Sequence, residues 1–278
     1  ADFTAGGLIT LTAQDEIGVL GSGTDTDLEF ATGSSVNIST TGTGAIDLDG
    51  LGTLTLTDLD TANGAITATS AGALTVTDVA SGTNGNISLT TTSGDITGLA
   101  TVNAGSGNVT LNSAGAIVDD GSAGTVITGG VLTADAAGAI TIDSTVASAN
   151  ISTSAAGNVD LDETDGITLT DLDTNDGSIT VDAGGLITAT DVVAAGGSGD
   201  SVTLTTTTGG AVATLVTGAD AVSITANAGD ITIGAVTATA GILGVTATAG
   251  SINDAADDNT ADFTAGGLIT LTAQDEIG

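Results

Sequence analysis

Residues 37–79 read NISTTGTGAIDLDGLGTLTLTDLDTANGAITATSAGALTVTDV, and this stretch decides the fold. It holds one short phrase twice, as GAIDL at 44–48 and GAITA at 64–68, and the phrase returns as GNISL at 85–89 and GNVTL at 107–111. The leading aliphatic positions are therefore evenly spaced, at Ile46, Ile66, Ile87 and Val109. Apolar and polar residues alternate within each phrase, which is typical of a β-strand with one buried face.

The spacing of the phrases indicates stacked coils. A second series with nearly the same spacing, Leu54, Leu74, Ile96 and Ile117, runs in parallel, so each coil carries at least two short strands. Glycine, asparagine and aspartate separate the strands and suit tight corners. In a β-sandwich the apolar positions do not recur at this constant interval, whereas in stacked coils each coil repeats them. We therefore predict an all-β fold, a right-handed parallel β-helix (β-solenoid) with coils of about 20–23 residues.

The alternation also predicts which side chains stack inside the coils. In the run 53–57, the threonines are expected to face solvent while Leu54 and Leu56 face inward. The leading aliphatic residues of the other strands follow the same rule. The predicted inner stack is Ile46, Leu48, Leu54, Ile66, Leu74, Ile87, Val109, Ile140, Val159, Ile179, Val202 and Ile231.

Two longer repeats lie above the coil. Residues 37–79 align without a gap with residues 150–192, and ADFTAGGLITLTAQDEIG occurs both at 1–18 and at 261–278. We predict that residues 1–260 form one full tandem-repeat unit of continuous solenoid, with internal blocks at about 28–140 and 141–260. Residues 261–278 then begin the next identical repeat. A repeat should hold roughly 12 coils, or about 58 Å at the spacing of neighbouring strands.

The composition excludes most chemistry. The chain has 34 Asp and Glu residues and no Lys, Arg, His, Cys, Pro, Met, Trp or Tyr. Carboxylates are then the sole acid–base groups, and neither a thiolate nor an imidazole metal site is possible. The net charge of −34 opposes binding to nucleic acid and to anionic membranes. We expect no enzymatic activity, no nucleic-acid partner and no membrane insertion.

The excess charge itself predicts a class of partner. Removing the three acids of the duplicated tail, Asp262, Asp275 and Glu276, leaves 31 of the 34 within positions 1–260. Spread over about 58 Å, they give about 0.5 charge per Å, close to duplex DNA. Such a surface should gather divalent cations or bind cationic surfaces.

The repeated phrases, such as GLITLT at 7–12 and GAITI at 138–142, resemble the repeats of filamentous haemagglutinin-like adhesins and other giant bacterial surface proteins. The resemblance spans nearly all of the chain, although shafts of that family commonly contain lysine and this chain has none. It implies a structural shaft of a secreted or cell-surface fibre, acting in adhesion, extracellular matrix or filament formation. The implied partners are neighbouring repeats of the same chain and parallel fibres of the same protein, at an extracellular or cell-surface location.

A recurring Thr-Asp-aliphatic corner is the sharpest chemical feature. Its aspartates recur one coil apart, so their carboxylates should stack at about the strand spacing. Stacked carboxylates suit a hard cation such as Ca²⁺, whereas the alternative is that each aspartate merely bonds the backbone of its own turn. Asn63 and Asp176 are two further polar residues expected at the same corner. The candidate metal ligands are Asp58, Asp60, Asp78, Asp171, Asp173 and Asp191.

The sequence is compatible with three further properties. Repeated Thr-x-Thr pairs, such as those at 10–12 and 75–77, are compatible with ice binding, or simply with outward strand positions. The carboxylate pairs Asp47/Asp49 and Asp160/Asp162 are compatible with a β-helical polysaccharide-active enzyme. Four Asn-x-Ser/Thr triplets are compatible with glycosylation, or with the turns in which the asparagines lie.

Overall fold

The computed structural model describes residues 1–18, 28–122, 124, 126–256 and 260–278. The described residues form strands and turns without a helix, and parallel strands stack as a β-solenoid of about 11 turns. None of these residues belongs to a helix of the length and hydropathy needed to cross a membrane. The all-β solenoid prediction is therefore confirmed. The chain divides into two compact units, Ala1–Ala137 with Ile142–Val146, and Gly138–Thr141 with Ala147–Gly278.

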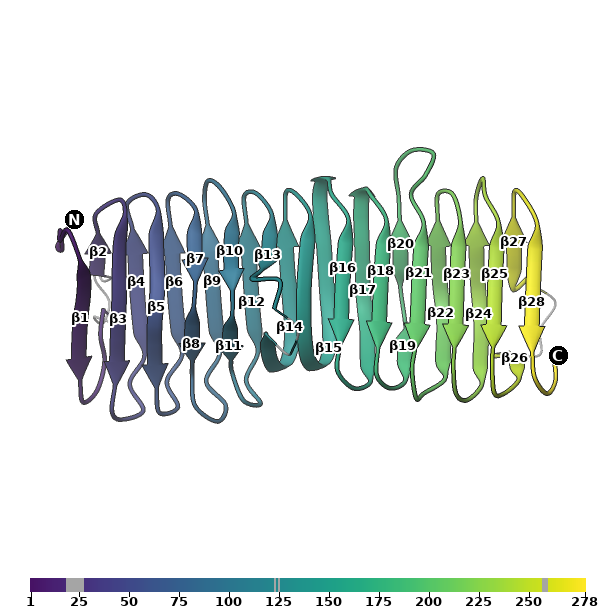
Figure 1. Cartoon of the computed structure of the whole chain (residues 1–278), viewed down its shortest axis with the longest axis horizontal. Coiled ribbons are helices and arrows are strands. Elements are labelled where there is room, and N and C mark those ends of the chain that lie inside the picture. Colours follow the sequence, from purple (N-terminus) through teal and green to yellow (C-terminus); the bar gives the residue numbers. More distant parts are fainter. Residues whose placement is uncertain (19–27, 123, 125, 257–259) are drawn as a thin grey trace. The chain divides into compact units, whose positions relative to one another are not determined.

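The first unit consists of short strands separated by tight turns (Figure 1). Its strands are β1 (Leu8–Ala13), β2 (Leu28–Phe30), β3 (Ser34–Thr40), β4 (Ile46–Gly50), β5 (Leu54–Thr61), β6 (Ile66–Ser70), β7 (Leu74–Val76), β8 (Asp78–Ala80), β9 (Ile87–Thr91), β10 (Ile96–Leu99), β11 (Thr101–Asn103), β12 (Val109–Ser113), β13 (Ile117–Asp119) and β14 (Ile127–Ala136).

The second unit has the same construction, and one long strand, β15 (Ile140–Ala156), contributes residues to both units. The remaining strands are β16 (Val159–Glu163), β17 (Ile167–Asp176), β18 (Ile179–Ala183), β19 (Ile187–Ala189), β20 (Val192–Ala194), β21 (Val202–Thr206), β22 (Ala211–Gly218), β23 (Val222–Ala226), β24 (Ile231–Ala238), β25 (Leu243–Ala247), β26 (Ile252–Asp254), β27 (Phe263–Ala265) and β28 (Ile269–Ala273).

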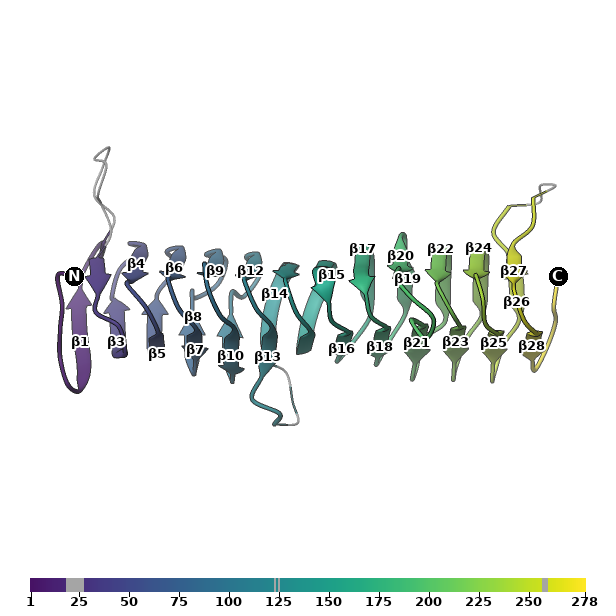
Figure 2. The ribbon, with the colours of Figure 1, turned by 90° about the horizontal axis from the view of Figure 1, so that it is seen from above.

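Each strand pairs in parallel with the equivalent strand of the neighbouring coil. In the first unit, Ile46 lies opposite Ile66, Ile66 opposite Ile87, and Ile87 opposite Val109. Successive coils thus place the same kind of residue at the same point of the cross-section. The view from above shows the strands of successive coils following one another along each unit (Figure 2). A column of aliphatic side chains runs through the unit as a result.

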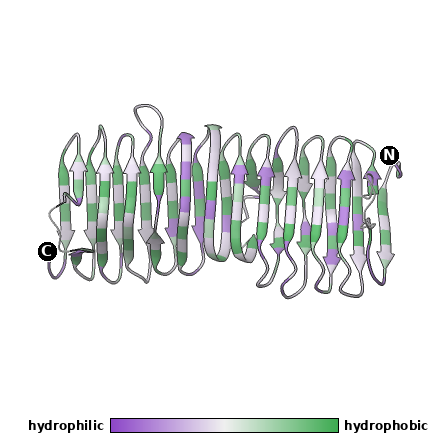
Figure 3. Ribbon diagram, turned by 180° about the vertical axis from the view of Figure 1, so that it is seen from behind, coloured by the Kyte–Doolittle hydropathy of each residue, from purple (hydrophilic) through white to green (hydrophobic). Residues whose placement is uncertain are grey.

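The second unit repeats this column through β16, β18, β21, β23 and β25, with every pair in parallel register. Green and pale bands alternate along the strands when residues are coloured by hydropathy (Figure 3). All twelve residues predicted for the inner stack are buried, with exposed fractions of 0 or 1 %. Period-two alternation therefore predicts the core of both units correctly.

Coil length varies more than the repeated phrases suggest. Ile46 pairs with Ile66, a short coil, but Leu8 pairs with Ser35 and Leu243 pairs with Ile269, which makes these two coils clearly longer. The long coils contribute to a total of about 11 turns in the chain, where roughly 12 were expected for one repeat.

Buried hydroxyl groups close many of the corners. Thr61 Oγ1 donates to the carbonyl of Gly64 at 2.7 Å, Thr91 Oγ1 to that of Gly94 at 2.8 Å, and Thr174 Oγ1 to that of Gly177 at 2.5 Å. All three threonines are at most 5 % exposed. Because a buried carbonyl without a partner is costly, the hydroxyl satisfies an acceptor where the chain leaves the strand. Not every threonine faces solvent, since these threonines at or near the end of a strand donate to a carbonyl in the corner.

Gly82 shows why corners need glycine. Its φ is +70°, and a Cβ atom at this position would overlap the carbonyl oxygen of Ala62 on the preceding coil. Left-handed backbone and close coil-to-coil approach both exclude a side chain here.

Candidate functional site

The predicted acidic corner exists in the first unit. Leu56 pairs with Val76 and Leu59 pairs with Val79, so the intervening Asp58 lies beside the aspartate that begins β8. Asp78 is that residue, and both carboxyl groups are half-buried. Neighbouring coils therefore bring two acidic side chains together at this corner, as their one-coil spacing predicts.

A β-bulge sets the position of Asp58. Val36 pairs with Leu56 but Asn37 pairs with Asp58, so Thr57 is an extra residue on β5. A bulge of this kind bends the strand and re-aims the next side chain. Here it places Asp58 opposite Asn37, whose Nδ2 donates to Asp58 Oδ2 at 2.9 Å.

Asp60 completes the first corner, two positions beyond Asp58 on β5. Its pKa is raised to about 6, mainly by partial burial and then by the charge of Asp58, a hydrogen bond with Asp58 and the charge of Asp78. The pKa of Asp78 is also raised, first by burial and then by the charge of Asp58. The two carboxyl groups of β5 therefore lie close enough for their repulsion to favour the neutral form of Asp60.

The second unit repeats this arrangement in the aligned block 150–192. Ala149 pairs with Leu169 and Asn150 pairs with Asp171, so the same bulge recurs. The pKa of Asp173 is raised to about 6, mainly by partial burial and then by the charges of Asp171 and Asp191 and a hydrogen bond with Asp171. Two copies of one carboxyl arrangement thus occur in one chain.

Asp191 adds a feature of its own. Its Oδ1 atom is buried without a hydrogen-bond partner, while its main-chain carbonyl accepts the Leu172 N–H at 3.0 Å. Within the described residues, no three acidic side chains gather closely enough to hold a metal ion. Calcium binding by the six aspartates stays a prediction.

The two further residues assigned to this corner lie elsewhere. Asn63 Oδ1 accepts hydrogen bonds from Thr83 Oγ1 at 2.9 Å and from the Asn84 N–H at 3.0 Å, both on the next coil. Asp176 pairs with Ala156 at the far end of β17. The asparagine that does join the corner, Asn37, is visible in the sequence only as part of an Asn-x-Ser triplet, because its contact depends on the bulge.

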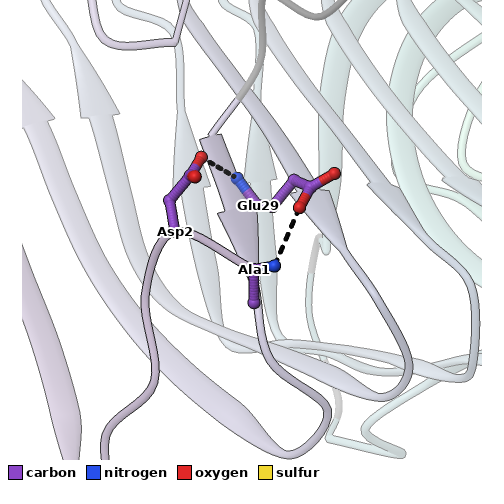
Figure 4. Close-up of polar contacts among 3 residues, drawn as sticks. All are labelled: Ala1, Asp2 and Glu29. Carbon is purple, nitrogen blue, oxygen red and sulfur yellow. Dashed lines mark hydrogen bonds and ion pairs between the residues drawn. The ribbon is translucent and has the colours of Figure 1, made fainter.

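The amino group of Ala1 contacts an acidic side chain. The amino group of Ala1 lies 2.9 Å from Glu29 Oε2, and the Glu29 N–H donates to Asp2 Oδ2 at 3.2 Å (Figure 4). Among the described carboxylates, only Glu163 is buried, and every other one reaches solvent. The rest of the chain offers no basic side chain to neutralise them.

The chain matches no protein-family model, no curated protein and no solved structure.

Proposed function

We propose that this chain is a segment of the structural shaft of a giant secreted or cell-surface fibre, acting in adhesion, matrix or filament formation. One observation carries the proposal: parallel coils pair by their backbones, and the last eighteen residues repeat the first eighteen. A ladder of this kind extends by adding coils, because each coil contacts only its neighbours. The filamentous haemagglutinin-like repeats that the sequence resembles are used in this way.

The surface supports a mechanical and adhesive role. Paired carboxyls recur on the strands, and 34 acidic residues meet no basic side chain. Divalent cations held by such a surface would bridge parallel fibres or tie them to acidic glycans. Calcium at the two carboxyl corners is the most specific form of this proposal, because the corners already crowd carboxyl groups together.

The first experiment tests the shaft itself. A chain of two repeats, residues 1–260 followed by residues 1–278, should appear in electron micrographs as one unbroken rod. Its length should exceed that of the single chain by about 4.8 Å for each added coil. Two bodies joined by a flexible joint would contradict the proposal.

The second experiment tests the cation. Fibre bundling and melting temperature are measured with added Ca²⁺ and with chelator, at fixed ionic strength. The expected result is less bundling and a lower melting temperature with chelator. The variant Asp58→Asn/Asp171→Asn should lose most of the calcium response, while Asp165→Asn, an exposed carboxylate at a bend, should keep it. A wild-type chain indifferent to chelator would remove calcium from the proposal.

A further inference from the structure

One face of the second unit carries two straight columns of outward residues. β21, β23 and β25 pair in parallel over five residues each, from Val202 opposite Val222 to Ala226 opposite Ala247, without a shift. The inward residues of these strands are buried, and the residues that alternate with them face solvent. The first column is Thr203, Ser223 and Gly244, and the second is Thr205, Thr225 and Thr246. These six positions, five with a hydroxyl group and one glycine, are called the hydroxyl face below.

Variation in coil length does not disturb the columns. The coil from Leu243 to Ile269 is clearly longer than the coil from Val202 to Val222, yet the strands of both stay in register. The additional residues lie outside the paired segments 243–247 and 269–273, and the second column continues to Thr272 on β28. The outward residues of each column therefore repeat at the strand spacing of about 4.8 Å, although the coils differ in length.

The hydroxyl face has no charge, in a chain with 34 acidic residues. Residues 201–253 include two of them, Asp220 and Asp230, and both lie between strands. In the first unit, by contrast, the paired strands β4, β6, β9, β12 and β14 carry Asp47, Asp49 and Asp135 at outward positions. An ion finds no opposite charge on the hydroxyl face, so the face suits an uncharged ligand.

The hydroxyl groups of this face are available to a ligand. Thr206, the inward residue at the end of β21, donates from Oγ1 to the Gly209 carbonyl at 2.5 Å. The outward hydroxyls of β21, β23 and β25 have no hydrogen-bond partner among the residues that the structure describes. Each hydroxyl has one donor and two acceptor positions, and these therefore bond water or a ligand that presents oxygen atoms.

The spacing within a column matches that of ordered water. Water in ice forms tetrahedral hydrogen bonds, so two oxygen atoms bonded to the same water lie about 4.5 Å apart when each bond is about 2.75 Å long. Hydroxyls of one column repeat at about 4.8 Å, a distance that two bonds of about 2.9 Å to a shared water span. One water thus bridges each pair of neighbouring coils, and successive bridges form a regular row. An ice surface already holds its water in place, so binding to it costs little immobilisation entropy.

We propose that the hydroxyl face binds ice. Its hydroxyl groups occupy positions of water oxygens in the outer layer of the crystal, and the threonine methyl groups lie between the rows of water. Register and charge select this face among the Thr-x-Thr pairs of the chain. The column that begins at Thr10, for example, continues through Asn37 to Asp58 and so ends at a carboxylate. The activity goes beyond a structural shaft, because a single folded chain is sufficient for it.

The experiment measures capture of the full chain by slowly growing ice, together with the gap between the melting and freezing temperatures of single ice crystals. The wild-type chain should be enriched in the ice and should hold the freezing temperature below the melting temperature. Gly244→Thr supplies the missing hydroxyl of the first column, at a position where an added Cβ meets nothing within 4 Å. This variant should raise the captured fraction by about twofold or more, since one hydrogen-bonding group is added. Gly197→Thr is its control, because a Cβ there also meets nothing within 4 Å and the residue lies between strands.

A second pair of variants tests the same face by loss. Thr225→Glu places a charge, with its own tightly held water, in the middle of the hydroxyl face and should remove most of the capture. Thr110→Glu is the matched control, since Thr110 is also half-exposed on a central strand, between Ser88 and Thr133 of the neighbouring coils. Circular dichroism shows that each variant is folded. A wild-type chain that ice excludes, equal capture of Thr225→Glu and Thr110→Glu, or a Gly244→Thr variant that behaves like Gly197→Thr would each overturn the proposal.

Discussion

Acid should stabilise this protein, and the two carboxyl corners should account for a defined part of the effect. The pKa of Asp60 and that of Asp173 are raised from 3.8 to about 6 in the folded chain. A carboxyl group whose pKa is raised by folding favours the folded state when protonated. Its stabilising contribution is complete below pH 3.8 and is lost as the pH rises through about 6. The relevant window is therefore about pH 4–6.

The size of the effect follows from the same shift. One pKa unit corresponds to about 1.4 kcal/mol, so the full shift sets an upper bound of about 3 kcal/mol for each carboxyl at neutral pH. Both side chains reach solvent, and screening reduces the expected value to about 1 kcal/mol for each corner. Replacing Asp60 or Asp173 by asparagine should recover this energy at pH 7, because an amide donates permanently to the neighbouring carboxylate. The gain corresponds to roughly 2–4 °C in melting temperature.

The assay is thermal unfolding followed by circular dichroism between about pH 4 and pH 8, a range that spans the raised pKa of Asp60. The wild-type melting temperature should rise as the pH falls from 7 to 4.5. The double variant Asp60→Asn/Asp173→Asn should be more stable at pH 7 and show a flatter profile. Asp165→Asn removes one exposed charge and controls for the general relief of repulsion. A wild-type melting temperature that falls on acidification to pH 5, or a double variant no more stable than this control, would refute the reasoning.

Two further predictions concern the fold. Ile66→Ala should lower the free energy of unfolding by about 2–5 kcal/mol, because Ile66 is fully buried between Ile46 and Ile87. Thr67 is half-exposed, so the control Thr67→Ala should change this free energy by under about 0.5 kcal/mol. Both are measured by denaturant titration. Gly82→Ala should cost about 1–3 kcal/mol, since it combines positive φ with an overlap onto the preceding coil. Gly197→Ala, where a Cβ meets nothing within 4 Å, should be nearly neutral in the same assay.

The candidate site was predictable in part. The regular spacing of the phrases was sufficient to predict that Asp58 lies next to Asp78, because parallel coils place equivalent residues side by side. The spacing did not predict the role of Asn37, since that contact exists only because Thr57 forms a bulge. The raised pKa of Asp60 depends on burial and on the side chain of Asp58, and neither follows from the spacing of the residues.

The sequence by itself determined the architecture and the core. Alternation with a period of two is a local property of a strand, and its regular return along the chain allows only stacked coils, so the buried aliphatic residues could be named before the structure. Only the tertiary structure shows where the chain departs from this alternation. The corner hydroxyls such as Thr61 and the bulges before Asp58 and Asp171 depend on how one coil registers against the next. These contacts join residues a full coil apart, and the regular spacing of the phrases does not show where one coil gains an extra residue relative to the next.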